Sequence, residues 1–168
     1  FCGTIEQAGA NMAHLTPGQM VVADINIGCG HCYWCRRNEV LNCPEMAQLG
    51  INRDGAFAEF VGLPGRLVIP APDGIAPEIL ALTEPVACVV RAARKAQAGI
   101  AQSVVVLGAG PVGNLHVQMM RLVGAAPIIV ADLSAERCAM AFDAGADLDD
   151  EAELQASADL AAAAEVAI

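Results

Sequence analysis

Hydrophobic residues in the first part of the chain come in short runs that are bounded by glycine and proline. Short apolar runs between such turn residues are typical of β-strands. Four stretches have this pattern: FCGTIEQAG (1–9), GQMVVADI (18–25), GAFAEFVGL (55–63) and GRLVIPAP (65–72). Residues 1–75 are therefore predicted to form a small, mostly β unit.

The spacing of apolar residues changes at Pro77. From there to Gln97 they recur every three or four residues, as on one face of a helix. Two consecutive helices are predicted, with Pro85 at the start of the second, because proline is favoured in the first turn of a helix. Residues 76–100 are thus expected to connect two units, with the boundary somewhere in these helices.

After residue 100 the pattern alternates between strand and helix. SVVVL (103–107) is a continuous apolar run of the kind that a parallel sheet buries on both faces, and PIIVAD (127–132) repeats it. Helical spacing follows each run, over residues 111–124 and 134–145.

The second of these helices has recognisable ends. Ser134 is expected to cap its N-terminus, and Gly145 is expected to end it. Residues 154–165 are predicted to form a third helix that leads to a strand at 165–168. Strand–helix alternation indicates an α/β layer, so the predicted fold class is a mostly-β part followed by a parallel sheet with helices over residues 101–168.

Charge and hydropathy narrow the class of protein. The 168-residue chain has a net charge of −10, which would repel phosphate backbones and disfavours nucleic acid as a partner. Six of its carboxylates lie in residues 143–154, which we interpret as a solvated face or loop. Hydrophobic residues make up 55% of the chain, yet no apolar run approaches the roughly 18 residues of a membrane helix. Neither a membrane partner nor a secretory signal is indicated, and a cytoplasmic location is expected.

Four of the seven cysteines lie close together in GCGHCYWCRRNEVLNC (28–43). Short C-x-x-C spacings let neighbouring thiolates converge on one zinc ion, so Cys29, Cys32, Cys35 and Cys43 are predicted to form a tetrathiolate site. A site filled by four protein ligands has no position for substrate and is structural. The alternatives are two disulfides or four free thiols, and disulfides belong mainly to oxidising compartments. His31 could compete as a ligand, but it is more simply explained as a solvent-facing loop residue.

A second motif lies between a predicted strand and a predicted helix. Gly108, Gly110 and Gly113 form G-x-G-x-x-G, in which the glycines allow a tight turn, approach to a pyrophosphate and close helix–strand packing. Asp132 ends the next predicted strand, where a carboxylate accepts hydrogen bonds from an adenosine ribose and repels a 2′-phosphate. NAD is therefore favoured over NADP. The alternative for Asp132 is an ordinary acid at a surface turn.

Together the two motifs make the sequence resemble the zinc-dependent medium-chain alcohol and polyol dehydrogenases, especially the sorbitol-dehydrogenase-like members. DGAFAEFV (54–61), LTEPVA (82–87) and ADLSAERCAMAFDAGAD (131–147) extend the similarity over nearly the whole chain. The resemblance implies a partial GroES-like domain at 1–75 with a structural zinc lobe at about 28–45, and the first part of an NAD-binding Rossmann domain at 101–168.

The resemblance also implies residue roles. The four lobe cysteines match structural zinc ligands. Glu84 matches a position that approaches a second, catalytic zinc directly or through its water, although it is equally well explained as a helix-start carboxylate. Asp132 and Arg137 match the pair that holds the adenosine ribose. The cofactor turn is matched by Gly108, Gly110, Pro111, Val112 and Gly113, with Val112 near the nicotinamide.

The implied reaction is hydride transfer from a secondary alcohol or polyol, a small-molecule substrate, to NAD. In that family the first catalytic cysteine and a Gly-His-Glu segment precede a stretch similar to FCGTIEQAG. This chain is therefore expected to be an internal piece of a longer, homo-oligomeric protein, and to be inactive alone. The alternative is a non-catalytic, zinc-stabilised binding or scaffold module, which predicts one zinc per chain and little affinity for dinucleotides.

Overall fold

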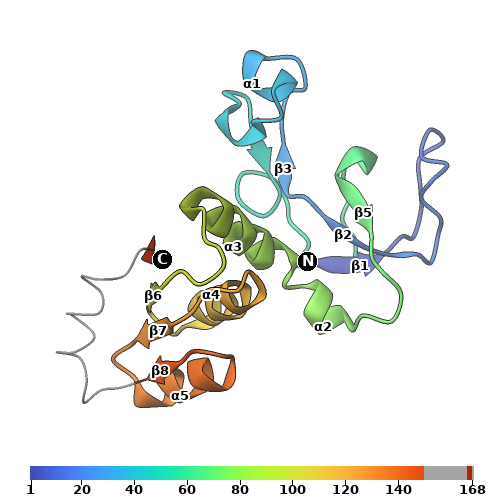
Figure 1. Cartoon of the computed structure of the whole chain (residues 1–168). Helices are drawn as coiled ribbons and strands as arrows, with labels where there is room; N and C mark the ends of the chain where they lie inside the picture. The colour runs from blue at the N-terminus through green and yellow to red at the C-terminus, as the bar shows by residue number, and fades with distance from the viewer. Residues whose placement is uncertain (150–165, 168) are drawn as a thin grey trace. The chain divides into compact units, whose positions relative to one another are not determined.

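The computed structural model describes residues 1–149 and 166–167. It divides into two compact units, Phe1–Glu84 and Pro85–Ile168, each with its own sheet (Figure 1).

The first unit is built on a three-stranded antiparallel sheet in the order β1-β2-β5. Its strands are β1 (Cys2–Thr4), β2 (Met20–Ala23) and β5 (Val68–Pro70), and the last follows a 3₁₀ turn, η2 (Gly65–Leu67). Val22, at the centre of the sheet, is buried and pairs with Cys2 on one side and Ile69 on the other. Three of the four predicted β stretches are thus confirmed.

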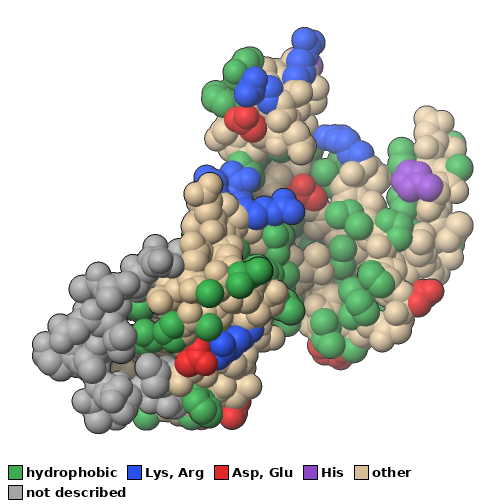
Figure 2. Space-filling view, viewed as in Figure 1, with side chains coloured by type: hydrophobic (Ala, Val, Ile, Leu, Met, Phe, Trp, Pro, Cys, Tyr) green, Lys and Arg blue, Asp and Glu red, His purple; other side chains and the backbone are tan. Residues whose placement is uncertain are grey.

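The cysteine loop projects from this unit on a short ladder. β3 (Asn26–Ile27) pairs antiparallel with β4 (Ala47–Gln48), so the two ends of the loop are held together. Between them lie α1 (Tyr33–Arg36) and a 3₁₀ turn, η1 (Val40–Asn42). We call residues 28–45 the lobe. Hydrophobic and basic side chains are exposed at its tip, around α1 (Figure 2).

The predicted strand at 55–63 is wrong, because the structure has no strand there. An isolated β segment needs a neighbouring strand for its N–H and C=O groups, and none of the ladders of the described residues includes this stretch. Phe57 and Phe60, the large residues of its apolar pattern, are exposed. The alternation of small and aromatic residues was therefore a misleading signal.

The two predicted helices after Pro77 are confirmed as α2 (Pro77–Leu80) and α3 (Thr83–Ala96). α3 begins two residues before Pro85, so this proline is in its first turn and not at its first position. Val89 and Ala93 are the buried residues of α3, one turn apart.

The second unit contains a four-stranded parallel sheet in the order β8-β7-β6-β9. β6 (Val104–Leu107) and β7 (Ile128–Ala131) are central, and three of the four residues in each are buried, as expected for strands covered on both faces. α4 (Pro111–Leu122) and α5 (Ala135–Asp143) follow them. Val117 and Met120 of α4 pack into a core with Val104 and Ile128. These strands and helices confirm the predicted α/β layer.

The edges of this sheet differ from the sequence prediction in one place. β8 (Leu148–Asp149) lies in the acidic stretch that we interpreted as a solvated face or loop, and these two residues form an edge strand and not a loop. β9 (Val166–Ala167) confirms the predicted C-terminal strand, and it pairs with β6 on the side opposite β7. The predicted helix at 154–165 lies outside the described residues. No helix in the described part of the chain is long and apolar enough to cross a membrane.

Candidate functional site

The lobe brings four sulfur atoms together. The Sγ atoms of Cys29, Cys32, Cys35 and Cys43 all lie within 4.8 Å of one another, and all four thiols are free. A tetrahedral zinc with Zn–S bonds of about 2.3 Å separates its sulfurs by about 3.8 Å. The Cys29–Cys35 separation is 4.0 Å, so the set needs little adjustment to hold such an ion.

The backbone of the lobe supports negative charge on these sulfurs. The backbone N–H of Cys32 donates to Cys29 Sγ, and that of Cys35 donates to Cys32 Sγ, each at 3.4 Å. Cys32 is thereby also the N-cap of α1. Gly28 is required because a Cβ atom there would lie 2.7 Å from Cys35 Sγ.

The close approach of the four sulfur atoms gives Cys29 and Cys35 very different pKa values. Hydrogen bonds from the backbone of His31 and then of Cys32 lower the pKa of Cys29 to about 6. A hydrogen bond from the Gly30 backbone lowers the pKa of Cys35, but burial and the three neighbouring thiols outweigh it and raise that pKa to about 11. A divalent cation removes this conflict, because it stabilises all four thiolates at once. The donor set therefore fits zinc.

A second group of potential ligands lies at the edge of the lobe. Cys29, His31 and Glu45 also have ligand atoms within 4.8 Å of one another, and the side chains of His31 and Glu45 are exposed. Among the described residues, both groups of three or more potential metal ligands are in the lobe, and neither includes Glu84. Glu84 is the second residue of α3, and it is exposed.

The glycine turn joins β6 to α4. Gly108 has a φ of +100°, Gly110 is the N-cap of α4, and Pro111 is the first residue of the helix. A Cβ atom on Gly113 would lie 1.9 Å from the carbonyl oxygen of Gly108, so only glycine allows α4 to approach the turn this closely. The N-terminus of α4 carries unpaired N–H groups and a partial positive charge, which favour an anion.

Asp132 lies beside this turn, directly after β7. The backbone N–H of Gly108 donates to the carbonyl of Ala131 at 2.8 Å and so holds the two strand ends together. Asp132 Oδ2 accepts a hydrogen bond from the N–H of Ala109 at 2.8 Å, and its Oδ1 accepts one from the N–H of Ser134 at 2.9 Å. The carboxylate thus connects the glycine turn to the start of α5.

The environment of Asp132 keeps it ionised. The hydrogen bond from Ala109, the hydrogen bond from Ser134 and the charge of Arg137 together lower the pKa of this carboxyl from its ordinary value of 3.8. Arg137 Nη1 lies 3.9 Å from Asp132 Oδ2, and the Arg137 side chain is 59% exposed. Arg137 therefore has solvent-facing donors in addition to its contact with Asp132.

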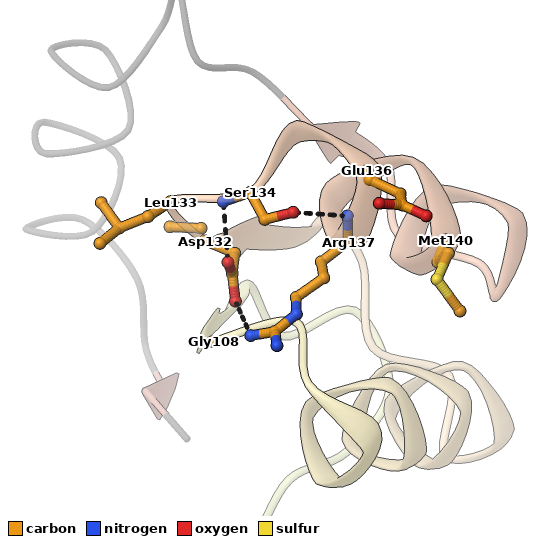
Figure 3. Close-up of a pocket in the computed structure, with 8 residues that line it drawn as sticks. Gly108, Asp132, Leu133, Ser134, Glu136, Arg137 and Met140 are labelled. Carbon is orange, nitrogen blue, oxygen red and sulfur yellow. Dashed lines mark hydrogen bonds and ion pairs between the residues drawn. The ribbon is translucent and has the colours of Figure 1, made fainter.

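These residues border an open depression of about 840 Å³ (Figure 3). Gly108, Asp132, Ser134 and Arg137 provide its polar side, and Leu133 and Met140 provide apolar surface. Arg137 reaches back toward Asp132, whereas Leu133 points away from the carboxylate and is exposed (Figure 3). The depression can receive a group that has hydroxyls on one side and an apolar face on the other.

The sequence analysis missed two contacts that hold this site. The side-chain amide of Asn114 donates to the carbonyl of Ala109 at 3.0 Å and so fixes the turn. Ala109 in turn donates to Asp132, which is 23 residues away. Asparagine in the first turn of a helix after a glycine motif was the available signal for the first contact. No feature of the sequence near Ala109 or Asp132 indicates the hydrogen bond between them.

The chain is similar in sequence to known dehydrogenases. Residues 1–73 match the alcohol dehydrogenase GroES-like domain. L-threonine 3-dehydrogenase of Mesorhizobium japonicum is 34% identical over 145 residues, which are 86% of this chain and 42% of that protein. The chain is homologous to the zinc-dependent medium-chain dehydrogenases.

Solved structures agree with this assignment. A zinc-binding dehydrogenase of Clostridium scindens superposes with a TM-score of 0.85 and 30% identity, over 96% of this chain and 46% of that one. A zinc-binding dehydrogenase of Sinorhizobium meliloti, solved with NADP bound, has a TM-score of 0.84 and 34% identity, over 88% of this chain and 43% of that one. The GroES-like and parallel-sheet parts of the fold are similar to those of these dehydrogenases, and the chain spans less than half the length of these relatives.

Proposed function

We propose that this chain is part of a zinc-dependent oxidoreductase that transfers hydride from a secondary alcohol or polyol to NAD. The observation that carries the proposal is the position of Asp132, an ionised carboxylate held by the glycine turn at the carboxyl end of a parallel strand. Ligands of open α/β sheets bind at these strand ends.

In this proposal the glycine turn and the N-terminus of α4 receive the pyrophosphate, because their N–H groups and helix dipole favour an anion. Asp132 accepts hydrogen bonds from the adenosine ribose hydroxyls. Arg137 orients the Asp132 carboxylate and contributes its exposed donors to the same sugar. Val112, in the first turn of α4 and half-exposed, is proposed to contact the nicotinamide.

NAD is proposed as the cofactor because Asp132 would repel a 2′-phosphate. The Sinorhizobium relative with bound NADP makes this preference worth testing directly, since Arg137 could also pair with a phosphate. Secondary alcohols are the proposed substrate class, because the hydroxyl group at carbon 3 of threonine, named in the M. japonicum relative, is a secondary alcohol.

Two zinc roles are proposed. Cys29, Cys32, Cys35 and Cys43 would hold a structural ion, whose four protein ligands leave no position for substrate. A catalytic zinc in the whole protein would polarise the alcohol oxygen, and Glu84 is proposed to approach that ion. Because the resemblance gives these 168 residues only Glu84 of the catalytic site, we expect no NADH formation when the chain alone is given a panel of polyols.

The test is titration of the chain with NADH and with NADPH in a calorimeter. We expect NADH to bind on the order of tenfold more tightly, because the 2′-phosphate faces an ionised carboxylate. Asp132→Asn should narrow this difference, since it keeps the shape of the side chain and removes its charge. Asp143→Asn is a matched control, because it removes an exposed carboxylate at the other end of α5 that does not line the depression. Equal or tighter binding of NADPH by the unmodified chain would contradict the NAD assignment, and no binding of either would favour the scaffold alternative.

A further inference from the structure

The group at the edge of the lobe has the features of a metal site in its own right. Cys29 offers a sulfur atom, His31 a ring nitrogen and Glu45 a carboxylate oxygen, all within 4.8 Å of one another. These are the three kinds of atom that zinc binds in proteins. This group is more than an exposed His31–Glu45 ion pair, because Cys29 is a member both of this group and of the tetrathiolate set.

The orientation of His31 favours metal binding. Its Nδ1 lies 3.0 Å from the carbonyl oxygen of Cys29. A carbonyl can only accept, so Nδ1 donates, and in the neutral imidazole the lone pair is then on Nε2. Histidines that bind metals typically donate their other ring N–H to a backbone carbonyl in this way, because the bond fixes both the tautomer and the ring orientation.

The gap between His31 and Glu45 also suits an ion. Nε2 lies 4.0 Å from Glu45 Oε1, which is too long for a hydrogen bond. Two metal–ligand bonds of about 2.1 Å each would span it. Both side chains are about two-thirds exposed, so solvent reaches them freely.

The two ligand sets differ in access and share one atom. In the tetrathiolate set Cys43 is buried and the other three cysteines are half-buried, whereas the side chains of His31 and Glu45 are about two-thirds exposed. An ion arriving from solution therefore meets the mixed set first. Because Cys29 belongs to both sets, the ion can move inward without leaving its first sulfur ligand.

We propose that Cys29, His31 and Glu45 form an outer zinc site that passes the ion to the tetrathiolate set. This inference rests on the proposed zinc role of the lobe. The hydrated ion first loses water as it binds the outer three ligands, and a proton still on Cys29 Sγ leaves to solvent in the same step. Cys32, Cys35 and Cys43 then each bind the ion as their remaining protons leave to solvent, and the bonds to His31 and Glu45 break. No electrons are transferred. The return path uses the same contacts, so the outer site speeds both loading and release.

The experiment is isotope exchange on the zinc-loaded chain. The chain is mixed with isotopically enriched zinc, and native mass spectrometry follows both the number of ions bound and the rate at which the isotope enters. His31→Ala and Glu45→Gln should each slow exchange on the order of tenfold. Zinc affinity, measured by competition with a chelator, should change less than twofold, because neither residue binds the ion in its final position.

Two controls match the chemistry of the variants. Glu39→Gln removes a lobe carboxylate that pairs with Arg37, and His14→Ala removes an exposed histidine outside the lobe. Both should exchange zinc at the unmodified rate. One bound zinc with unchanged exchange in His31→Ala and Glu45→Gln would overturn the outer site alone. A second tightly bound zinc per chain would overturn its transit role, and no bound zinc in the unmodified chain would overturn the proposed zinc role itself.

Discussion

Two glycines show how single atoms shape the candidate nucleotide site. Gly113 faces the carbonyl of Gly108 with no room for a side chain, whereas Gly110 has open space where its Cβ would lie. The two residues belong to the same motif, yet only one of them is sterically constrained in this structure. The close packing of α4 on the turn therefore depends on the missing side chain of Gly113 and not on that of Gly110.

This difference gives a sharp prediction. Gly113→Ala should lower the free energy of unfolding by about 1–3 kcal/mol, because the new methyl group must displace backbone. Gly110→Ala should lower it by less than about 1 kcal/mol, because its φ of −69° is open to any residue and nothing lies within 4 Å, so that only the weaker N-cap preference of alanine counts. Urea denaturation of both variants measures the two values. Equal losses of unfolding free energy in the two variants would show that the close approach of α4 to the turn does not explain why position 113 is glycine.

The charge of Asp132 has a pH dependence of known sign. Its pKa in the folded chain is below the ordinary value of 3.8, so its contribution to stability is complete above that value and is lost as pH falls through the folded pKa. Asp132→Asn should therefore reduce the decline in stability below about pH 4. Urea midpoints measured from pH 3 to pH 7 check this, and identical pH profiles for variant and unmodified chain would contradict it.

At the scale of elements, a network of polar contacts holds α4, β7 and the turn after α5. Arg121 near the end of α4 donates to the carbonyl of Gly145 and pairs with Asp147. Asp147 Oδ2 accepts from the N–H of Ile128 at 2.7 Å, at the start of β7. Burial tends to raise the pKa of Asp147, but Arg121 and the Ile128 N–H outweigh it and lower the pKa overall.

Asp147→Asn should destabilise the second unit by about 1 kcal/mol. The value is modest because both side chains of the pair are about a third exposed and solvent screens them. Glu39→Gln breaks the more exposed Arg37–Glu39 pair of the lobe and should change stability by less than half as much. Thermal unfolding followed by circular dichroism compares them. A larger effect from Glu39→Gln would contradict the assigned order.

Elements with a strong apolar period were predictable, and those that depend on a distant partner were not. β6, β7, α4 and α5 follow from the sequence because burial on both faces, or on one helix face, leaves a long signal. Residues 55–63 carry an apolar alternation but no strand, since pairing depends on another segment. At the candidate site the glycines and Asp132 were predictable, but the hydrogen bond from Ala109 to Asp132 joins residues that only the fold brings together.

At the scale of the whole molecule, the two units differ in what stabilises them. The second has a continuous core that includes Val104, Val117, Met120 and Ile128. In the lobe, Cys43 is the one buried residue among 28–45, and the two-residue ladder of β3 and β4 connects the lobe to the rest of its unit. So few apolar contacts do little to offset the conformational entropy of some eighteen ordered residues, and the proposed structural ion would supply the difference.

Removal of zinc should therefore have a local effect. In a reduced, chelator-treated chain, amide hydrogens of residues 28–45 should exchange at rates close to those of an unfolded peptide, because their hydrogen bonds lose the ion that orders them. Amides of β6 and β7 should keep their protection, since their core contains no lobe residue. Hydrogen exchange with mass spectrometry compares the segments before and after chelation, and Cys43→Ser should reproduce the chelated pattern without chelator. Protection of the lobe that survives chelation would mean that its own contacts suffice, and loss of protection in β6 and β7 would mean that the metal stabilises the whole chain and not the lobe alone.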